Sequence, residues 1–109
     1  MATAILIEFP KGTQRQYDEV IDALGLKDPN NLPRGLISHV AGPTESGWEV
    51  VDVWESRADF DRFLAQRLGP AVREAGLPAP RPIEFPVYNS MGQISIAGTR
   101  RARPRRRAA

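Results

Sequence analysis

Two polar residues of this chain, His39 and Asp52, have the types and the spacing for acid–base chemistry. His39 is the only histidine among the 109 residues, and it lies in the middle of an expected strand, as Asp52 does in the next. A carboxylate fixes the tautomer of a neighbouring imidazole and makes the ring a better proton acceptor. If the hairpin pairs Gly42 with Glu49, His39 lies opposite Asp52, whereas a shorter register makes them diagonal neighbours. An adjacent pair could abstract a proton from a phenol or an activated methylene.

The alternative is a structural role for His39, as a hydrogen-bonding residue of the fold or a contact with its symmetry mate in a dimer. The chain has no cysteine and one histidine, which excludes a thiolate nucleophile, a Cys-ligated metal and a His-rich metal site within one chain. It also has no phosphate-binding loop, nucleophile elbow or dinucleotide fingerprint. We therefore expect neither a metal nor a cofactor.

Several aromatic residues are candidates for contact with a flat apolar ligand. Trp54, and less strongly Trp48, could stack on an aromatic ring. Tyr17 lies on the apolar stripe of the first expected helix, so its hydroxyl needs a partner from the protein or from a ligand. Phe60 and Phe63 occupy the face of the second expected helix that turns towards the sheet. The candidate substrate-binding residues are Trp54, Tyr17, Phe60 and Phe63, with core packing as the alternative role.

Apolar periodicity and helix-capping signals predict the elements that must position these side chains. Strands are expected at Thr3–Phe9, Gly35–Ala41, Trp48–Glu55 and Pro82–Tyr88. Thr13 begins a capping box ahead of a first helix that Gly25 ends. Ser56 caps a second helix, which Gly69-Pro70 should break or kink because proline lacks the N–H donor and clashes with the preceding turn.

The order β-α-β-β-α-β predicts an α+β, ferredoxin-like fold, with a four-stranded antiparallel sheet and two helices. Pro82 and Pro86 confine the last strand to a sheet edge or an exchanged arm. Two helices can cover only one face of such a sheet. The alternation in Trp48–Glu55 puts apolar residues on both faces, with Val51 and Val53 on one and Trp48 and Trp54, together with Asp52, on the other. A second copy of the chain is the most economical cover, so we expect a homodimer.

The segment from Gly35 to Phe63, GLISHVAGPTESGWEVVDVWESRADFDRF, resembles small dimeric α/β-barrel proteins of the antibiotic-biosynthesis-monooxygenase type. The resemblance covers roughly residues 3–90, and its best local signature is Val53-Trp54-Glu55-Ser56 followed by Phe60 and Phe63. It implies a dimeric α/β barrel, a homodimer whose two sheets face each other, with a pocket in each subunit between sheet and helices. Members of this family include cofactor-free oxygenases of aromatic polyketides and haem-degrading enzymes.

The haem-degrading members use an Asn on the first strand and a His on the second helix. Here Thr3–Phe9 has no Asn and Arg57–Ala75 has no His, so only Trp54 matches that motif and haem cleavage is disfavoured. The resemblance implies a pocket for a small aromatic or polyketide-like molecule. In a cofactor-independent monooxygenase of this kind, His39 oriented by Asp52 would form a carbanion that reacts with oxygen. The alternative is a non-enzymatic ligand-binding or stress-associated protein.

Charge is distributed unevenly along the chain. Residues 98–109 carry six arginines and no acid, whereas the rest has nine basic and 13 acidic residues. We expect one domain at residues 1–92 and a disordered tail at 93–109, in which Arg100 to Arg107 could make weak, non-specific nucleic-acid contacts. A third possible function is therefore that of a polyanion-binding module that acts through this tail. The simpler interpretation is that the tail is an unselected extension. The longest apolar run, Ala4–Ile7, is too short for a membrane helix, and a cytoplasmic location is expected.

Overall fold

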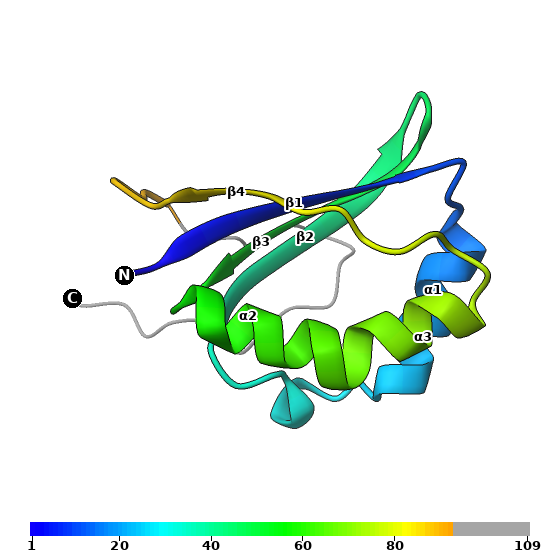
Figure 1. Ribbon diagram of the computed structural model, residues 1–109, viewed down its shortest axis with the longest axis horizontal. Helices are drawn as coiled ribbons and strands as arrows, with labels where there is room; N and C mark the ends of the chain where they lie inside the picture. Colours follow the sequence, from blue (N-terminus) through cyan, green and yellow to red (C-terminus); the bar gives the residue numbers. More distant parts are fainter. Residues whose placement is uncertain (93–109) are drawn as a thin grey trace.

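The computed structural model describes residues 1–92 of the chain (Figure 1). Its elements are β1 (Thr3–Pro10), α1 (Gln14–Leu24), the 3-10 turn η1 (Pro29–Asn31), β2 (Leu36–Thr44), β3 (Gly47–Trp54), α2 (Arg57–Phe63), the π-helical segment η2 (Leu64–Leu68), α3 (Gly69–Glu74) and β4 (Ile83–Pro86). The strands form one antiparallel sheet in the order β2-β3-β1-β4. This architecture confirms the predicted ferredoxin-like fold. The Arg-rich tail predicted at 93–109 lies outside the described residues.

Helix α1 begins and ends at the predicted residues. The Thr13 hydroxyl accepts a hydrogen bond from the backbone N–H of Gln16, and the Gln16 side chain accepts one from the backbone N–H of Thr13. At the other end Gly25 adopts a left-handed conformation, with φ at 70°, which glycine reaches without steric cost. The capping box fixes the first turn of α1, and Tyr17 lies one residue beyond Gln16 on this anchored turn.

The hairpin between β2 and β3 is tighter than predicted. Only Glu45 and Ser46 separate the strands, and the ladder continues through Gly42 and Pro43. A proline is tolerated there because β2 is an edge strand of the described sheet. Gly42 pairs with Glu49, the register under which His39 lies directly opposite Asp52. Both side chains therefore share one face of the sheet.

The second helix does not stop at Gly69-Pro70. Segments α2, η2 and α3 follow one another without a gap, and Figure 1 shows a bend between α2 and α3. Within η2 the backbone N–H of Gly69 donates to the carbonyl of Leu64, five residues back. This wider turn passes the chain into the first turn of α3, where a proline needs no N–H partner. The predicted kink is present, and a break is not.

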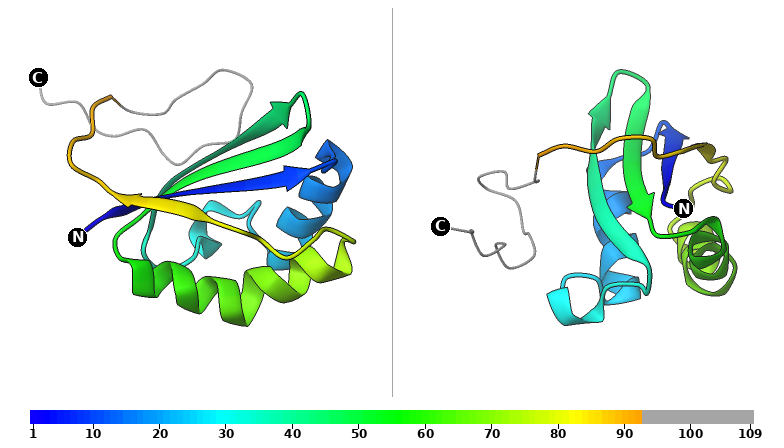
Figure 2. Two further views of the ribbon diagram at one scale, coloured as in Figure 1. Left: turned by 45° about the horizontal axis from the view of Figure 1, so that its top comes forward. Right: turned by 90° about the vertical axis from the view of Figure 1, so that its left-hand side faces the viewer.

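The last strand, β4, is shorter than the predicted Pro82–Tyr88. It lies at the edge beside β1, as its prolines require. An ion pair between Arg57 of α2 and Glu84 of β4 ties this edge to the helical layer. Figure 2 shows the helices together on one side of the sheet, with β2 and β4 at its two edges.

Cross-strand register puts two rows of side chains on the sheet face that the helices leave uncovered. Directly opposed residues of an antiparallel pair point to the same face. The first row consists of Val40, Val51, Leu6 and Ile83, and the second of Ser38, Val53, Ala4 and Phe85. Ile83 and Phe85 are 69% and 53% exposed. The first row of this open sheet face is therefore apolar across all four strands, and the second is apolar across β3, β1 and β4.

Asp59 accepts hydrogen bonds in the first turn of α2, and its ionisation predicts how the stability of the fold depends on pH. Hydrogen bonds from the Arg62 guanidinium and the Ser56 hydroxyl lower the pKa of Asp59 below 3.8. Because the pKa is lower in the folded chain than in the unfolded chain, this stabilisation is present above 3.8 and lost as the pH falls through the folded pKa. Asp59→Asn should lower the melting temperature at neutral pH and should have a diminishing effect in acid.

Thermal unfolding followed by circular dichroism from neutral to strongly acidic pH measures this difference. Asp61→Asn, on the same helix, is the control for removing a surface carboxylate. A deficit of Asp59→Asn that stays constant over the whole pH range would contradict the assignment of the stabilising charge to Asp59.

Candidate functional site

The candidate site is a chain of hydrogen-bonded side chains that runs from α1 across β2 to β3. The Tyr17 hydroxyl oxygen lies 2.6 Å from Nε2 of His39, and Nδ1 of His39 lies 2.6 Å from Oδ1 of Asp52. The other carboxylate oxygen of Asp52 accepts a hydrogen bond from the indole N–H of Trp54 at 3.1 Å. Three elements of the fold thus place four side chains in one continuous network, which we call the Tyr17–Trp54 network.

The carboxylate of Asp52 determines which ring nitrogen of His39 carries the proton. An ionised carboxylate can only accept hydrogen bonds, so Nδ1 carries the proton and Nε2 of the neutral ring is an acceptor. The Tyr17 hydroxyl therefore donates to Nε2 in this state. Asp52 is 4% exposed, while the His39 side chain is 30% exposed. A proton that arrives at Nε2 produces an imidazolium ion held by a charge-assisted hydrogen bond to a buried carboxylate.

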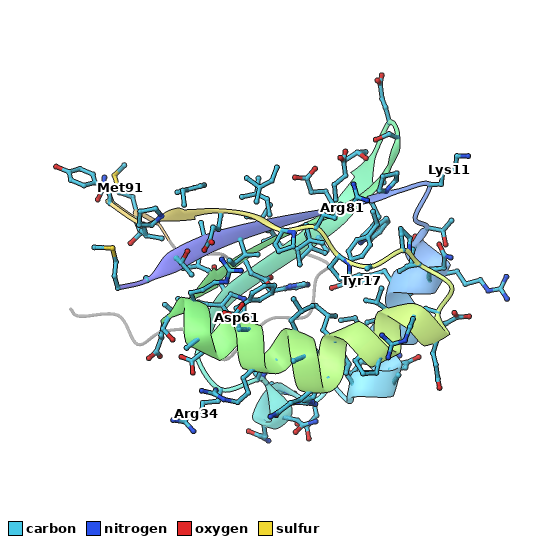
Figure 3. All side chains as sticks on the ribbon, viewed as in Figure 1. Lys11, Tyr17, Arg34, Asp61, Arg81 and Met91 are labelled. Atoms are coloured by element: carbon cyan, nitrogen blue, oxygen red, sulfur yellow. The ribbon has the colours of Figure 1, made fainter. Side chains whose placement is uncertain are left out.

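A cavity of about 140 Å³ lies between the sheet and the helices, and the network forms part of its wall. Tyr17, His39, Asp52, Trp54 and Phe63 all line it, and most of the remaining wall is aliphatic. Figure 3 shows Tyr17 between the helices and the sheet. An engineered apolar cavity of about 150 Å³ in another protein binds benzene. The space therefore suits a ligand of about one aromatic ring, and a larger flat molecule requires the walls to move.

The predicted aromatic residues take different positions. Trp54 is fully buried, with the Phe60 ring edge-on at 5.7 Å and the Phe63 ring tilted at 5.4 Å. Phe63 lines the cavity together with Trp54 and Tyr17. Phe60 is fully buried behind Trp54 and is not among the cavity-lining residues, so its position supports the core-packing role.

Trp48 has a larger part in the site than the sequence reasoning assigned to it. Its ring lies 5.3 Å from that of Tyr17, and it lines the cavity. Its indole N–H is buried and has no hydrogen-bond partner within residues 1–92. The alternation along β3 already placed Trp48 on the face of Asp52 and Trp54, but only the docking of α1 shows that it contacts Tyr17.

The two tryptophans provide a matched test of the hydrogen bond to Asp52. Trp54→Phe should couple to Asp52→Asn in a double-mutant cycle of unfolding free energies, because the first change removes the donor and the second weakens the acceptor. We expect a coupling energy of about 1 kcal/mol from urea unfolding. Trp48→Phe should show almost none, since its N–H does not reach Asp52. Equal coupling for both tryptophans would contradict the assignment.

Within the part of the chain that the structure describes, no group of three His, Cys, Asp or Glu side chains is arranged to hold a metal ion. In the same residues, no helix has the length and apolar character needed to cross a membrane. The cavity-lining residues with polar side-chain atoms are Thr13, Tyr17, His39, Trp48, Asp52 and Trp54.

No protein-family model and no curated protein matches this sequence. Solved structures match it over most of its length. A candidate antibiotic biosynthesis monooxygenase from Chloroflexus aurantiacus J-10-fl superposes with a TM-score of 0.58 at 16% identity, over 84% of this chain and 98% of the other. SnoaB, a cofactor-independent oxygenase from Streptomyces nogalater, superposes with a TM-score of 0.57 at 16% identity, over 84% of this chain and 97% of the other. The chain shares their fold.

A dimeric ferredoxin-like protein of unknown function from Thermobifida fusca YX also matches, with a TM-score of 0.52 at 20% identity over 80% of this chain and 92% of the other. At such identities the likeness shows the fold and leaves the chemistry to the residues of this chain. The resemblance to proteins of the antibiotic-biosynthesis-monooxygenase type is confirmed at that level.

Proposed function

We propose that this protein is a homodimeric, cofactor-independent monooxygenase that acts on a small aromatic molecule with an acidic proton. The observation that carries the proposal is the position of His39, held between a buried carboxylate and a tyrosine hydroxyl at the wall of an apolar cavity. An oriented imidazole suits general-base catalysis. The fold shared with SnoaB, described as a cofactor-independent oxygenase, supports the same reaction class.

In the proposed reaction a methylene activated by an aromatic ring and a carbonyl loses a proton to the network centred on His39. The resulting carbanion is the reductant, and molecular oxygen is the oxidant. The methylene becomes a carbonyl; one oxygen atom enters the product, and the other leaves as water. The apolar wall limits access of water to the carbanion, and Asp52 stabilises the imidazolium ion that forms beside it.

Oxygen uptake in the presence of compounds with one, two and three rings tests this function. Phenylacetone, 2-indanone and anthrone each carry an activated methylene. We expect wild-type protein to catalyse oxygen consumption with at least one of them and to form one carbonyl per oxygen molecule. Binding of all three without oxygen uptake would contradict the enzyme proposal and favour the alternative, a ligand-binding protein with the same cavity.

The open sheet face supports the proposed homodimer. An apolar surface that crosses four strands and exposes Ile83 and Phe85 is unfavourable in water. A second copy of the chain offers the same surface, so a two-fold axis would bury both at once. The similar Thermobifida fusca protein is described as dimeric, which supports this arrangement. The two sheets would then face each other as a dimeric α/β barrel.

A further inference from the structure

We propose that Tyr17, and not His39, is the residue that exchanges the proton with the ligand. His39 then receives the Tyr17 proton without touching the substrate. This inference rests on the proposed function and adds a catalytic residue to it.

Both ring nitrogens of His39 are already engaged. Nδ1 lies 2.6 Å from the buried carboxylate of Asp52, and Nε2 lies 2.6 Å from the Tyr17 hydroxyl. A ligand that approaches Nε2 directly would have to displace that hydroxyl. Tyr17 lies at the end of the network opposite to Trp54, and it lines the cavity.

Packing fixes the position of the Tyr17 ring. The ring lies nearly parallel to that of His39, with centroids 6.0 Å apart and planes within 11°, and it lies 5.3 Å from the Trp48 ring. The capping box at Thr13 anchors the helical turn that carries it. A group whose orientation is set by packing needs little reorganisation to accept and donate a proton.

The proton transfers balance without any co-reactant. The O–H or C–H bond of the ligand breaks, and its proton forms an O–H bond to Tyr17. The original Tyr17 proton moves to Nε2 of His39. The products are a ligand anion, a neutral tyrosine and an imidazolium ion whose Nδ1–H donates to the carboxylate of Asp52.

Tyr17→Phe distinguishes this relay from direct transfer to His39. If Tyr17 relays the proton, the variant keeps His39 as a base, but the ligand proton does not reach it. The ligand is then no longer ionised. If His39 acts directly, removal of the hydroxyl uncovers Nε2, and ionisation is retained or increased. The two mechanisms predict effects of opposite sign.

The test uses 4-nitrophenol, a one-ring probe whose phenolate absorbs at longer wavelength than the neutral phenol. Full-length wild-type protein at mildly acidic pH should bind the probe and convert it to phenolate. Tyr17→Phe should bind the probe in its neutral form. Tyr88→Phe removes the hydroxyl of the other tyrosine, which is fully exposed, and should behave as wild type. Equal affinity for 4-nitroanisole, which has no acidic proton, shows that the cavity is intact in each variant.

Phenolate formation that persists in Tyr17→Phe but disappears in His39→Gln would overturn the inference and leave the proposed function standing. Bound but neutral probe in wild-type protein would contradict both. Wild-type ionisation that is lost in Tyr17→Phe and kept in Tyr88→Phe is the result expected of the relay.

Discussion

Replacement of His39 by alanine should lower the turnover rate by about 10²–10⁴, the usual scale for loss of a general base. No other residue of the Tyr17–Trp54 network can act as the base and hold the proton beside the buried carboxylate of Asp52. Oxygen uptake with saturating substrate, divided by the concentration of folded protein, measures the effect. Asp52→Asn should also slow the reaction, because the imidazolium ion would lose its anionic partner.

The structural role of His39 predicts a different pattern. His39→Ala would then lower the melting temperature and leave the turnover per folded molecule unchanged, which would contradict the general-base mechanism.

Val51→Asp should convert a dimer into a monomer. Val51 lies between Val40 and Leu6 in the first row of the open sheet face, so each subunit would bring an unpaired carboxylate into the interface. We expect the dissociation constant to rise by more than about a hundredfold, since an unpaired buried charge costs about 3–5 kcal/mol.

Sedimentation at micromolar concentration measures the assembly. Wild-type protein should sediment as twice its 12.1 kDa chain mass, and Val51→Ala, which keeps the face apolar, is the matched control. A wild-type monomer at that concentration would contradict the homodimer. So would a Val51→Asp variant that remains dimeric.

Local sequence signals predicted most of the fold because they act over a few residues. The Thr13 capping box and Gly25 fixed the ends of α1, and strand alternation assigned Asp52 and Trp54 to one face and Val51 to the other. Where a signal depended on tertiary context, the outcome differed. The π-helical turn before Pro70 and the two-residue hairpin are adjustments that depend on neighbouring elements.

The part of the site that depends on neighbouring strands was predicted from the sequence, because hairpin pairing is also a local signal. The pairing of His39 with Asp52 was one of a small set of hairpin registers, and the structure shows that register. The contact between Tyr17 and His39 joins residues 22 positions apart on a helix and a strand. It depends on how α1 docks on the sheet, which periodicity does not specify. The cavity and the burial of the Trp48 N–H are likewise products of packing.

The most direct test of the network as a proton acceptor is the absorption spectrum of bound 4-nitrophenol in wild-type protein and in His39→Gln. Both proteins should bind 4-nitroanisole with the same affinity. Wild-type protein should hold 4-nitrophenol as the phenolate at a pH where the free probe is mainly neutral, and His39→Gln should hold it in the neutral form. Neutral probe in wild-type protein, or phenolate in His39→Gln, would show that His39 does not receive the proton.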